Sequence, residues 1–194
     1  MSLIDEDEAL IASAVNGSAY AWEKLVRRYE SRVYNQGLRL TGNPSDAMDL
    51  VQEVFLGVYR NLHRFRGDAK FSSWVFRIAH NKAVDMTRRK KLLTVKSSSD
   101  DENFDFFDTL PGDSHAEPEN RLKAQELNSQ VLKLLGTLPL EQRLLVECKV
   151  FQSLTFEEIA ELQDMSVNTA KTRFYAALKK LKVASEEANV LPQD

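Results

Sequence analysis

The sequence of 194 residues contains little of what several classes of protein require. Cys148 is its only cysteine, which excludes a disulfide within the chain and fits a reducing compartment. The longest run without a charged residue, Ala9–Trp22, has 14 residues, too few to span a bilayer. The first ten residues have neither the basic nor the apolar segment of a secretory signal. These absences predict a cytoplasmic protein without direct membrane insertion.

Signals of catalysis and of cofactor binding are equally scarce. The three histidines, His63, His80 and His115, are scattered without the spacing of metal ligands. Neither a Gly-rich phosphate loop nor a recognisable catalytic pair of acids is present. Cys148 follows Leu144 at helical spacing, which favours a small buried hydrophobe over a nucleophile. We therefore expect no enzymatic activity, no cofactor and no metal.

Charge is segregated along the chain, although the net charge is only −3. From Arg60 to Lys91, ten Lys or Arg residues stand against two Asp residues. Eight acids and no Lys or Arg lie between Ser97 and Asn120, and five bases without an acid lie between Met165 and Lys182. Two basic blocks around an acidic one predict two contacts with nucleic acid. Ordinary solvated surface charge is the alternative interpretation.

Hydrophobic periodicity predicts helix almost everywhere outside Lys91–Asn120, and hence an all-α fold. The expected helices are Glu8–Asn16, Ala19–Leu40, Asp46–Asn61, one from Ser72 or Ser73, one from Arg121 to about Gly136, and Leu140–Phe151, followed by a further pair near the C-terminus. Serines, prolines and acids dominate the gap, which predicts an extended linker. We expect two small helical domains, residues 1–91 and 121–194, joined by an acidic linker over residues 92–120.

The segment Asp46–Arg89 has an acidic first half and a basic second half. In the first half, an apolar stripe comprises Ala47, Leu50, Val51, Val54, Phe55, Val58, Tyr59 and Leu62. On another side of the same helix, Asp46, Asp49 and Glu53 fall together beside Gln52. Like charges at this spacing cost a few tenths of a kcal/mol. The helix dipole offsets some of that cost near the N-terminus, but less at Glu53, which suggests a partner for the acids.

A loop with Arg64, Arg66, Gly67 and Lys70 leads into the basic second half. Its apolar positions, Phe71, Trp74, Val75 and Ile78, are expected in the core. The remaining positions, Arg77, His80, Asn81, Lys82 and Arg88, mostly point elsewhere.

Leu154–Lys182 has the pattern of a helix-turn-helix. Thr155 and Glu158 are placed to form a capping box, and Gln163–Ser166 predicts a brief turn before the second helix, Val167–Lys182. At 100° per residue, the outer face of that helix carries Asn168, Thr172, Ala176 and Lys179, flanked by Lys171 and Tyr175 on one side and Arg173 on the other. Short polar and basic side chains on such a helix favour binding in a DNA major groove.

Two ordered blocks of sequence resemble bacterial RNA polymerase sigma factors of the extracytoplasmic function (ECF) type. The first block contains DLVQEVF at Asp49–Phe55, FRGD at Phe65–Asp68 and FSSWVFRIA at Phe71–Ala79. The second begins with LPLEQR at Leu138–Arg143 and continues through Leu154–Arg173. The resemblance spans roughly residues 7–185 and implies sigma region 2 and sigma region 4 domains about the linker.

The resemblance also implies partners and sites. Core RNA polymerase would bind Asp46, Asp49, Gln52 and Glu53. Promoter −10 DNA, with a flipped base, would contact Phe65, Arg66, Lys70, Phe71, Arg77, Asn81 and Arg88. The −35 element would be bound by Asn168, Lys171, Thr172, Arg173, Tyr175 and Lys179. Ala176 departs from the family in lacking a hydrogen-bonding group. Such proteins open promoters and initiate transcription in stress or envelope responses, and an anti-sigma factor commonly holds them.

Two other classes of function are the alternatives to a sigma factor. A stand-alone helix-turn-helix regulator with a helical sensor domain would account for the C-terminal part, but it leaves the acid face and the first basic block unexplained. An enzyme would need the catalytic signals that the sequence lacks. Binding to core polymerase discriminates the sigma factor from both.

Overall fold

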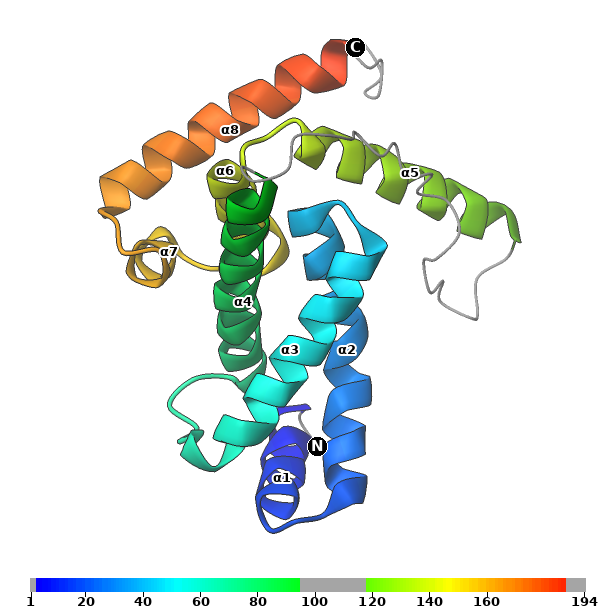
Figure 1. Cartoon of the computed structure of the whole chain (residues 1–194), viewed down its shortest axis with the longest axis vertical. Helices are drawn as coiled ribbons and strands as arrows, with labels where there is room; N and C mark the ends of the chain where they lie inside the picture. Colours follow the sequence, from blue (N-terminus) through cyan, green and yellow to red (C-terminus); the bar gives the residue numbers. More distant parts are fainter. Residues whose placement is uncertain (1–2, 95–117, 188–194) are drawn as a thin grey trace. The chain divides into compact units, whose positions relative to one another are not determined.

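The computed structural model describes residues 3–94 and 118–187, and every regular element within these ranges is helical (Figure 1). The prediction of an all-α fold is therefore confirmed. The chain divides into two units, one of residues 1–37 and 45–101 and the other of residues 38–44 and 102–194. The predicted linker falls mostly outside the described residues: residues 92–94 continue a helix, residues 118–120 begin one, and residues 95–117 are not described.

The first unit is built from four α-helices and one short 3-10 turn within its described part. They are α1 (Leu3–Val15), α2 (Ala19–Thr41), α3 (Pro44–Asn61), η1 (Leu62–Arg64) and α4 (Phe71–Thr94), although residues 38–41 of α2 and Pro44 of α3 are grouped with the second unit. Ser18 accepts a hydrogen bond from the backbone N–H of Ala21, which caps α2 as its position before the helix predicts. The short α1 begins earlier than its expected start at Glu8.

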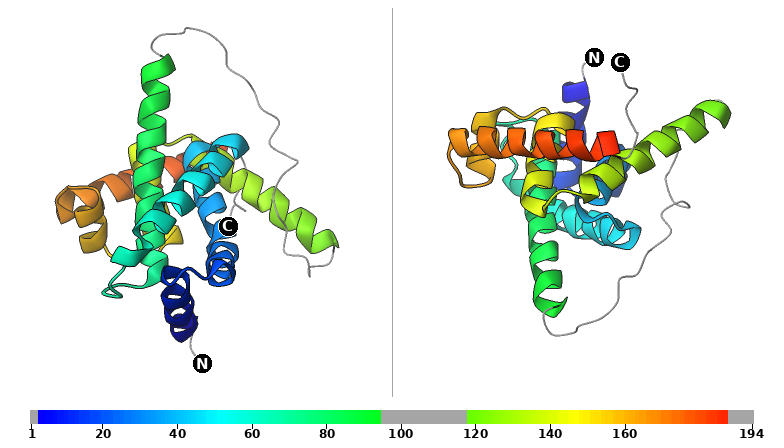
Figure 2. Two further views of the ribbon diagram at one scale, coloured as in Figure 1. Left: turned by 60° about the horizontal axis from the view of Figure 1, so that its bottom comes forward. Right: turned by 90° about the horizontal axis from the view of Figure 1, so that it is seen from above.

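The core of this unit lies between α2, α3 and α4, which run side by side in Figures 1 and 2. Its fully buried side chains include Leu25, Val33, Leu50, Val54, Val58 and Val75. A Cβ on Gly37 would lie 2.9 Å from the Ala47 Cα, so the close approach of α2 to α3 requires glycine there. Tyr59, a member of the predicted apolar stripe, lies outside this core. Its ring is 61% exposed, and it packs edge-on against Trp22 at 5.1 Å because it lies at the margin of the apolar stripe.

The second unit contains α5 (Pro118–Gly136), α6 (Leu140–Val146), the π-helical turn η2 (Glu147–Phe151), α7 (Phe156–Leu162) and α8 (Val167–Glu187). The expected single α-helix over Leu140–Phe151 therefore changes to wider turns after Val146. The N–H of Gln152 donates to the Glu147 carbonyl, five residues back, at 3.1 Å.

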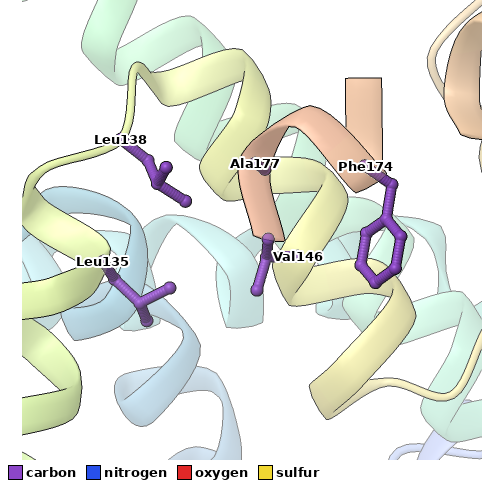
Figure 3. Packing of buried hydrophobic residues seen from close by; sticks show 5 residues of the cluster. All are labelled: Leu135, Leu138, Val146, Phe174 and Ala177. Carbon is purple, nitrogen blue, oxygen red and sulfur yellow. The ribbon is translucent and has the colours of Figure 1, made fainter. Parts of the chain in front are cut away.

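Two clusters of apolar side chains hold α8 against the rest of this unit. Figure 3 shows the first, in which Leu135 and Leu138 approach Val146 of α6 together with Phe174 and Ala177 of α8. The second cluster contains Leu145, Cys148, Ile159 and Ala170, all 0% exposed. Burial raises the pKa of the Cys148 thiol to about 12, so this cysteine is protonated and serves as core, as its spacing predicts.

Candidate partner and nucleic-acid surfaces

The acidic side chains of α3 form one face, as their spacing predicts. Asp49, Gln52 and Glu53 are exposed, and Asp46 is half-buried near the helix N-terminus. The buried residues of α3 are Ala47, Leu50, Val54, Phe55 and Val58, so the acids point away from the core. The structure thus leaves these four predicted site residues accessible to a partner.

An exposed apolar stripe, which the sequence interpretation did not identify, flanks this acidic face. Met48, Leu56 and Tyr59 are 49%, 45% and 61% exposed. Leu56 follows Met48 by eight residues and Tyr59 follows Leu56 by three, so the three side chains lie along one side of α3. Gln52, halfway between Met48 and Leu56, lies on the same side. Apolar side chains beside charged ones are typical of a surface that a macromolecular partner covers.

The acidic face also contacts α4 through an ion pair. Lys82 Nζ lies 2.8 Å from Glu53 Oε2, and this hydrogen bond lowers the pKa of the Glu53 carboxyl. The pair lies in a shallow cavity of about 270 Å³, which is lined by Asp49, Gln52, Glu53, Lys82, Asp85, Met86 and Arg89. The sequence did not indicate this ion pair, because the two residues lie 29 positions apart in the chain.

Four aromatic rings meet beneath the loop that joins η1 to α4. We refer to Tyr29, Phe65, Phe71 and Trp74 as the aromatic cluster. Its ring centroids lie 5.3 Å apart for Phe65 and Phe71, 5.4 Å for Phe65 and Trp74, 5.4 Å for Tyr29 and Phe71, and 5.7 Å for Phe71 and Trp74. The predicted packing role of Trp74 is confirmed by these contacts.

The residues of the loop differ in their access to a ligand. Gly67 has a φ of +78°, a conformation that favours glycine, and it turns the chain between the exposed Arg66 and Lys70. Phe65 is half-buried, whereas Phe71 is 5% exposed. Phe71 therefore lies behind the loop surface, and Phe65 presents the more accessible ring.

Three predicted DNA-binding residues share one face of α4. Arg77, Asn81 and Arg88 are all exposed, and their spacing of four and seven residues aligns them along the helix. His80, expected to point away from the core, is 3% exposed, so that expectation is wrong. It lies on the buried stripe of Phe76 and Ala83, and desolvation lowers its pKa to about 4.

The helix-turn-helix of the second unit forms as predicted. Thr155 Oγ1 accepts from the Glu158 N–H at 3.2 Å, and Glu158 Oε2 accepts from the Thr155 N–H at 2.7 Å, which completes the capping box. In the turn, Asp164 has a φ of +50°, and Ser166 caps α8 by accepting from the Thr169 N–H at 3.0 Å. Local hydrogen bonds therefore fix where each helix of the pair begins.

The outer face of α8 carries every residue predicted to contact the −35 element. The six side chains Asn168, Lys171, Thr172, Arg173, Tyr175 and Lys179 are all exposed. Tyr175 is 62% exposed, with its ring against Phe174 at 5.6 Å. An ion pair joins Arg173 to Glu141 of α6 at 3.5 Å. Glu141 is 78% exposed, and no feature of its sequence position announced this contact.

None of the helices in the described ranges is both long and apolar enough to cross a membrane.

The acidic face of α3, the exposed face of α4 and the outer face of α8 lie in segments that match known protein families. Residues 25–92 match Sigma-70 region 2, and residues 128–181 match Sigma-70, region 4. The two regions, in this order and on these folds, define the class of RNA polymerase sigma factors.

Curated relatives narrow the class. The chain is 33% identical over 175 residues to the ECF RNA polymerase sigma-E factor of Escherichia coli (strain K12), which spans 88% of this chain and 90% of the relative. The sigma-E factor of Salmonella typhimurium (strain LT2) matches equally. The RNA polymerase sigma-H factor of Pseudomonas aeruginosa is 29% identical, over 89% of this chain and 90% of its own. The chain belongs to the ECF family of RNA polymerase sigma factors.

Two solved structures share the fold. The first is CnrH in complex with the cytosolic domain of CnrY, with a TM-score of 0.59, 23% identity and coverage of 94% of this chain and 99% of that one. The second is the sigma factor RpoE in complex with the anti-sigma factor NepR from Bartonella quintana, with a TM-score of 0.63, 18% identity and coverage of 88% and 98%.

Family membership confirms the predicted function and favours it over the stand-alone regulator. As a sigma factor, the protein binds core RNA polymerase, recognises promoter DNA and directs the initiation of transcription. Sigma factors are themselves non-catalytic initiation factors.

Proposed function

We propose that this sigma factor uses three separate surfaces, one to bind core polymerase and two to bind promoter DNA. The acidic face of α3 (Asp46, Asp49, Gln52 and Glu53) binds core polymerase. The loop and α4 bind the −10 element through Phe65, Arg66, Lys70, Arg77, Asn81 and Arg88, with the buried Phe71 in a supporting role behind Phe65. The outer face of α8 (Asn168, Lys171, Thr172, Arg173, Tyr175 and Lys179) binds the −35 element. The corresponding domains are residues 1–91 and 121–194, with residues 92–120 as the linker.

The observation that carries the proposal is the exposed stripe of Arg77, Asn81 and Arg88 on α4, the helix whose first turn contributes Phe71 and Trp74 to the aromatic cluster. Capture of a single strand requires cations for its phosphates and a stacking surface for an unstacked base. Arg66 and Lys70 supply cations beside the half-buried ring of Phe65. Phe71 supports that ring from behind at 5.3 Å.

The proposal for α8 depends on charge and access. Between Met165 and Lys182 there are five bases and no acid, so no acid in this part of α8 repels phosphate. Helix-turn-helix proteins place the first turns of the second helix against base edges in the major groove. Asn168, Lys171 and Thr172 occupy those turns here.

Run-off transcription with core polymerase tests the assignment of the acidic face. The double substitution Asp49→Lys and Glu53→Lys should abolish run-off product and weaken binding to core, whereas Glu30→Lys, an exposed acid on α2, should change neither. If the double variant binds core as tightly as the wild type, α3 is not the polymerase surface. Direct binding of the full chain to −35 duplex should persist in both variants.

A regulatory partner is also proposed. Two proteins of the same fold were solved with partners, in one case a named anti-sigma factor. The exposed apolar stripe of Met48, Leu56 and Tyr59 beside the acids supplies a surface that such a partner could cover. We infer that an anti-sigma factor holds this chain in the cytoplasm. A protein that co-purifies with the chain from its own cells should suppress reconstituted run-off, and a Leu56→Lys variant should escape it. Retained suppression of that variant would exclude α3 as the surface bound.

A further inference from the structure

Helix α1 precedes the segment that matches region 2, which begins at residue 25. It lies next to η1, the turn that leads into the −10 loop. Its acid Asp7 has a side chain that is only 13% exposed. An acid buried to this extent in a short surface helix requires partners.

Among the described residues, Asp7 has two hydrogen-bond partners, and both belong to α2. Arg28 Nη1 donates to Asp7 Oδ1 at 2.6 Å, and the Tyr29 hydroxyl donates to Asp7 Oδ2. Tyr29 is 5% exposed. The carboxylate therefore fixes the hydroxyl end of a buried ring, and the arginine satisfies the charge of the carboxylate.

The other end of Tyr29 contacts the aromatic cluster. Its ring lies edge-on to Phe71 at 5.4 Å with an interplanar angle of 71°. Phe71 in turn lies edge-on to Phe65 at 5.3 Å and 82°. Edge-to-face contacts depend on the angle between rings, so a rotation of Tyr29 changes the support of Phe71 and then of Phe65.

We propose that Asp7 is a positioning residue for −10 recognition: it holds Tyr29 in the orientation that keeps Phe71, and through it Phe65, in place for the unstacked base. The proposal rests on the function proposed above for Phe65. Helix α1 is thereby part of the −10 apparatus, although it contacts no DNA in this scheme.

The test uses the full chain assembled with core polymerase and fork-junction DNA with a single-stranded non-template −10 segment. Each base of that segment is replaced in turn by an abasic site. The measured quantity is the ratio of dissociation constants for abasic and intact DNA at the most sensitive position. A merely stabilising residue changes the melting temperature but leaves this ratio unchanged.

Tyr29→Phe keeps the ring and removes the donor, and Asp7→Ala removes the acceptor. Each should lower the ratio about threefold to tenfold, the range expected when an aromatic contact is disordered. The double variant should fall no further, because both changes break one interaction. Asp7→Asn keeps an oxygen acceptor and should restore part of the ratio. Glu8→Ala, the neighbouring exposed acid, is the matched control and should behave as the wild type.

The possible failures are distinguishable. If Phe65→Ala leaves the ratio unchanged, the proposed function of the loop is wrong. If Phe65→Ala lowers the ratio while Tyr29→Phe and Asp7→Ala lower only the melting temperature, the loop assignment stands and the positioning role of Asp7 is overturned.

Discussion

The two helices proposed to bind DNA, α4 and α8, both expose polar and basic side chains, but different contacts hold each helix in place. On α8 the polar and basic side chains project from a helix that begins at the Ser166 cap and is held in place by two apolar clusters. On α4 the exposed stripe depends on the aromatic cluster and on a neighbouring acidic helix. Each helix has a base that pairs with an acid of a neighbouring helix, Lys82 with Glu53 and Arg173 with Glu141. However, α4 also carries Asp85, whereas α8 carries no acid in its first five turns.

This difference separates two tasks. Duplex recognition needs a rigid helix with an exposed edge, and local sequence signals suffice to build it. Holding a melted strand needs a stacking surface, and the surface proposed for it is assembled from α2, the loop and α4 through ring contacts. The second surface is therefore more sensitive to changes in residues that never touch DNA.

The largest expected effect comes from removing one ring from each unit. Phe71→Ala and Phe174→Ala should each lower the free energy of unfolding of their own unit by about 3–5 kcal/mol, as truncation of a buried Phe does. Both rings are buried, at 5% and 7% exposure. Both tryptophans, Trp22 and Trp74, lie in the first unit, so the fluorescence transition in urea reports on that unit.

Phe71→Ala should therefore shift the tryptophan fluorescence transition to lower urea. Phe174→Ala should shift the circular dichroism transition and leave the fluorescence transition unchanged. An equal shift of tryptophan fluorescence by both variants would contradict the assignment of separate cores.

Acid should destabilise the first unit through His80. The folded-state pKa of His80 is about 4, below its ordinary value of 6.5, because burial disfavours the charged ring. As pH falls from 6.5 toward 4, the His80 ring becomes protonated in the unfolded chain but stays neutral in the folded unit. Up to about 3 kcal/mol of the free energy of unfolding is therefore lost over that pH range. Above pH 6.5 the effect is absent. Urea midpoints of wild type and His80→Gln at pH 7, 6 and 5 measure it, and parallel curves would contradict it.

Much of this architecture could be predicted from sequence because its signals are local. The α8 faces follow from period 3.6, and the capping box follows from Thr155 and Glu158 three residues apart. His80 was misplaced because neutral histidine is tolerated in cores, although its spacing from Phe76 and Ala83 was a usable signal. The pairs Glu53–Lys82 and Asp7–Tyr29 join residues more than 20 positions apart, and only tertiary packing brings them together.

A third prediction concerns the salt dependence of α8. Lys171→Ala and Arg173→Ala should each lower the slope of log K against log salt for −35 duplex by about one, if each cation neutralises one phosphate. Glu141→Gln releases Arg173 from its ion pair and should raise affinity by at most about fivefold, since exposed pairs contribute little. Fluorescence anisotropy titrations over a series of salt concentrations supply the slopes. Slopes unchanged in both alanine variants would remove α8 from the phosphate contacts.

The smallest expected effect is the coupling energy of the Glu53–Lys82 pair. It tests whether Glu53 stabilises the first unit or binds polymerase. The two side chains are 48% and 37% exposed, so a double-mutant cycle with Glu53→Gln and Lys82→Met should give a coupling of about 0.2–1 kcal/mol. Because Lys82 lowers the pKa of Glu53, this coupling is present above the ordinary pKa of a glutamate and is lost as pH falls through the lowered value.

The exchange Glu53→Lys with Lys82→Glu separates the two roles, because it keeps an ion pair but reverses the charge on α3. We expect it to recover the stability lost in Glu53→Lys alone, as measured by urea unfolding, while binding to core polymerase stays weak. If stability and polymerase binding both recover, Glu53 affects polymerase binding only by holding α4. The basic side chains of α4 would then depend on an ion pair for their position, unlike those of α8.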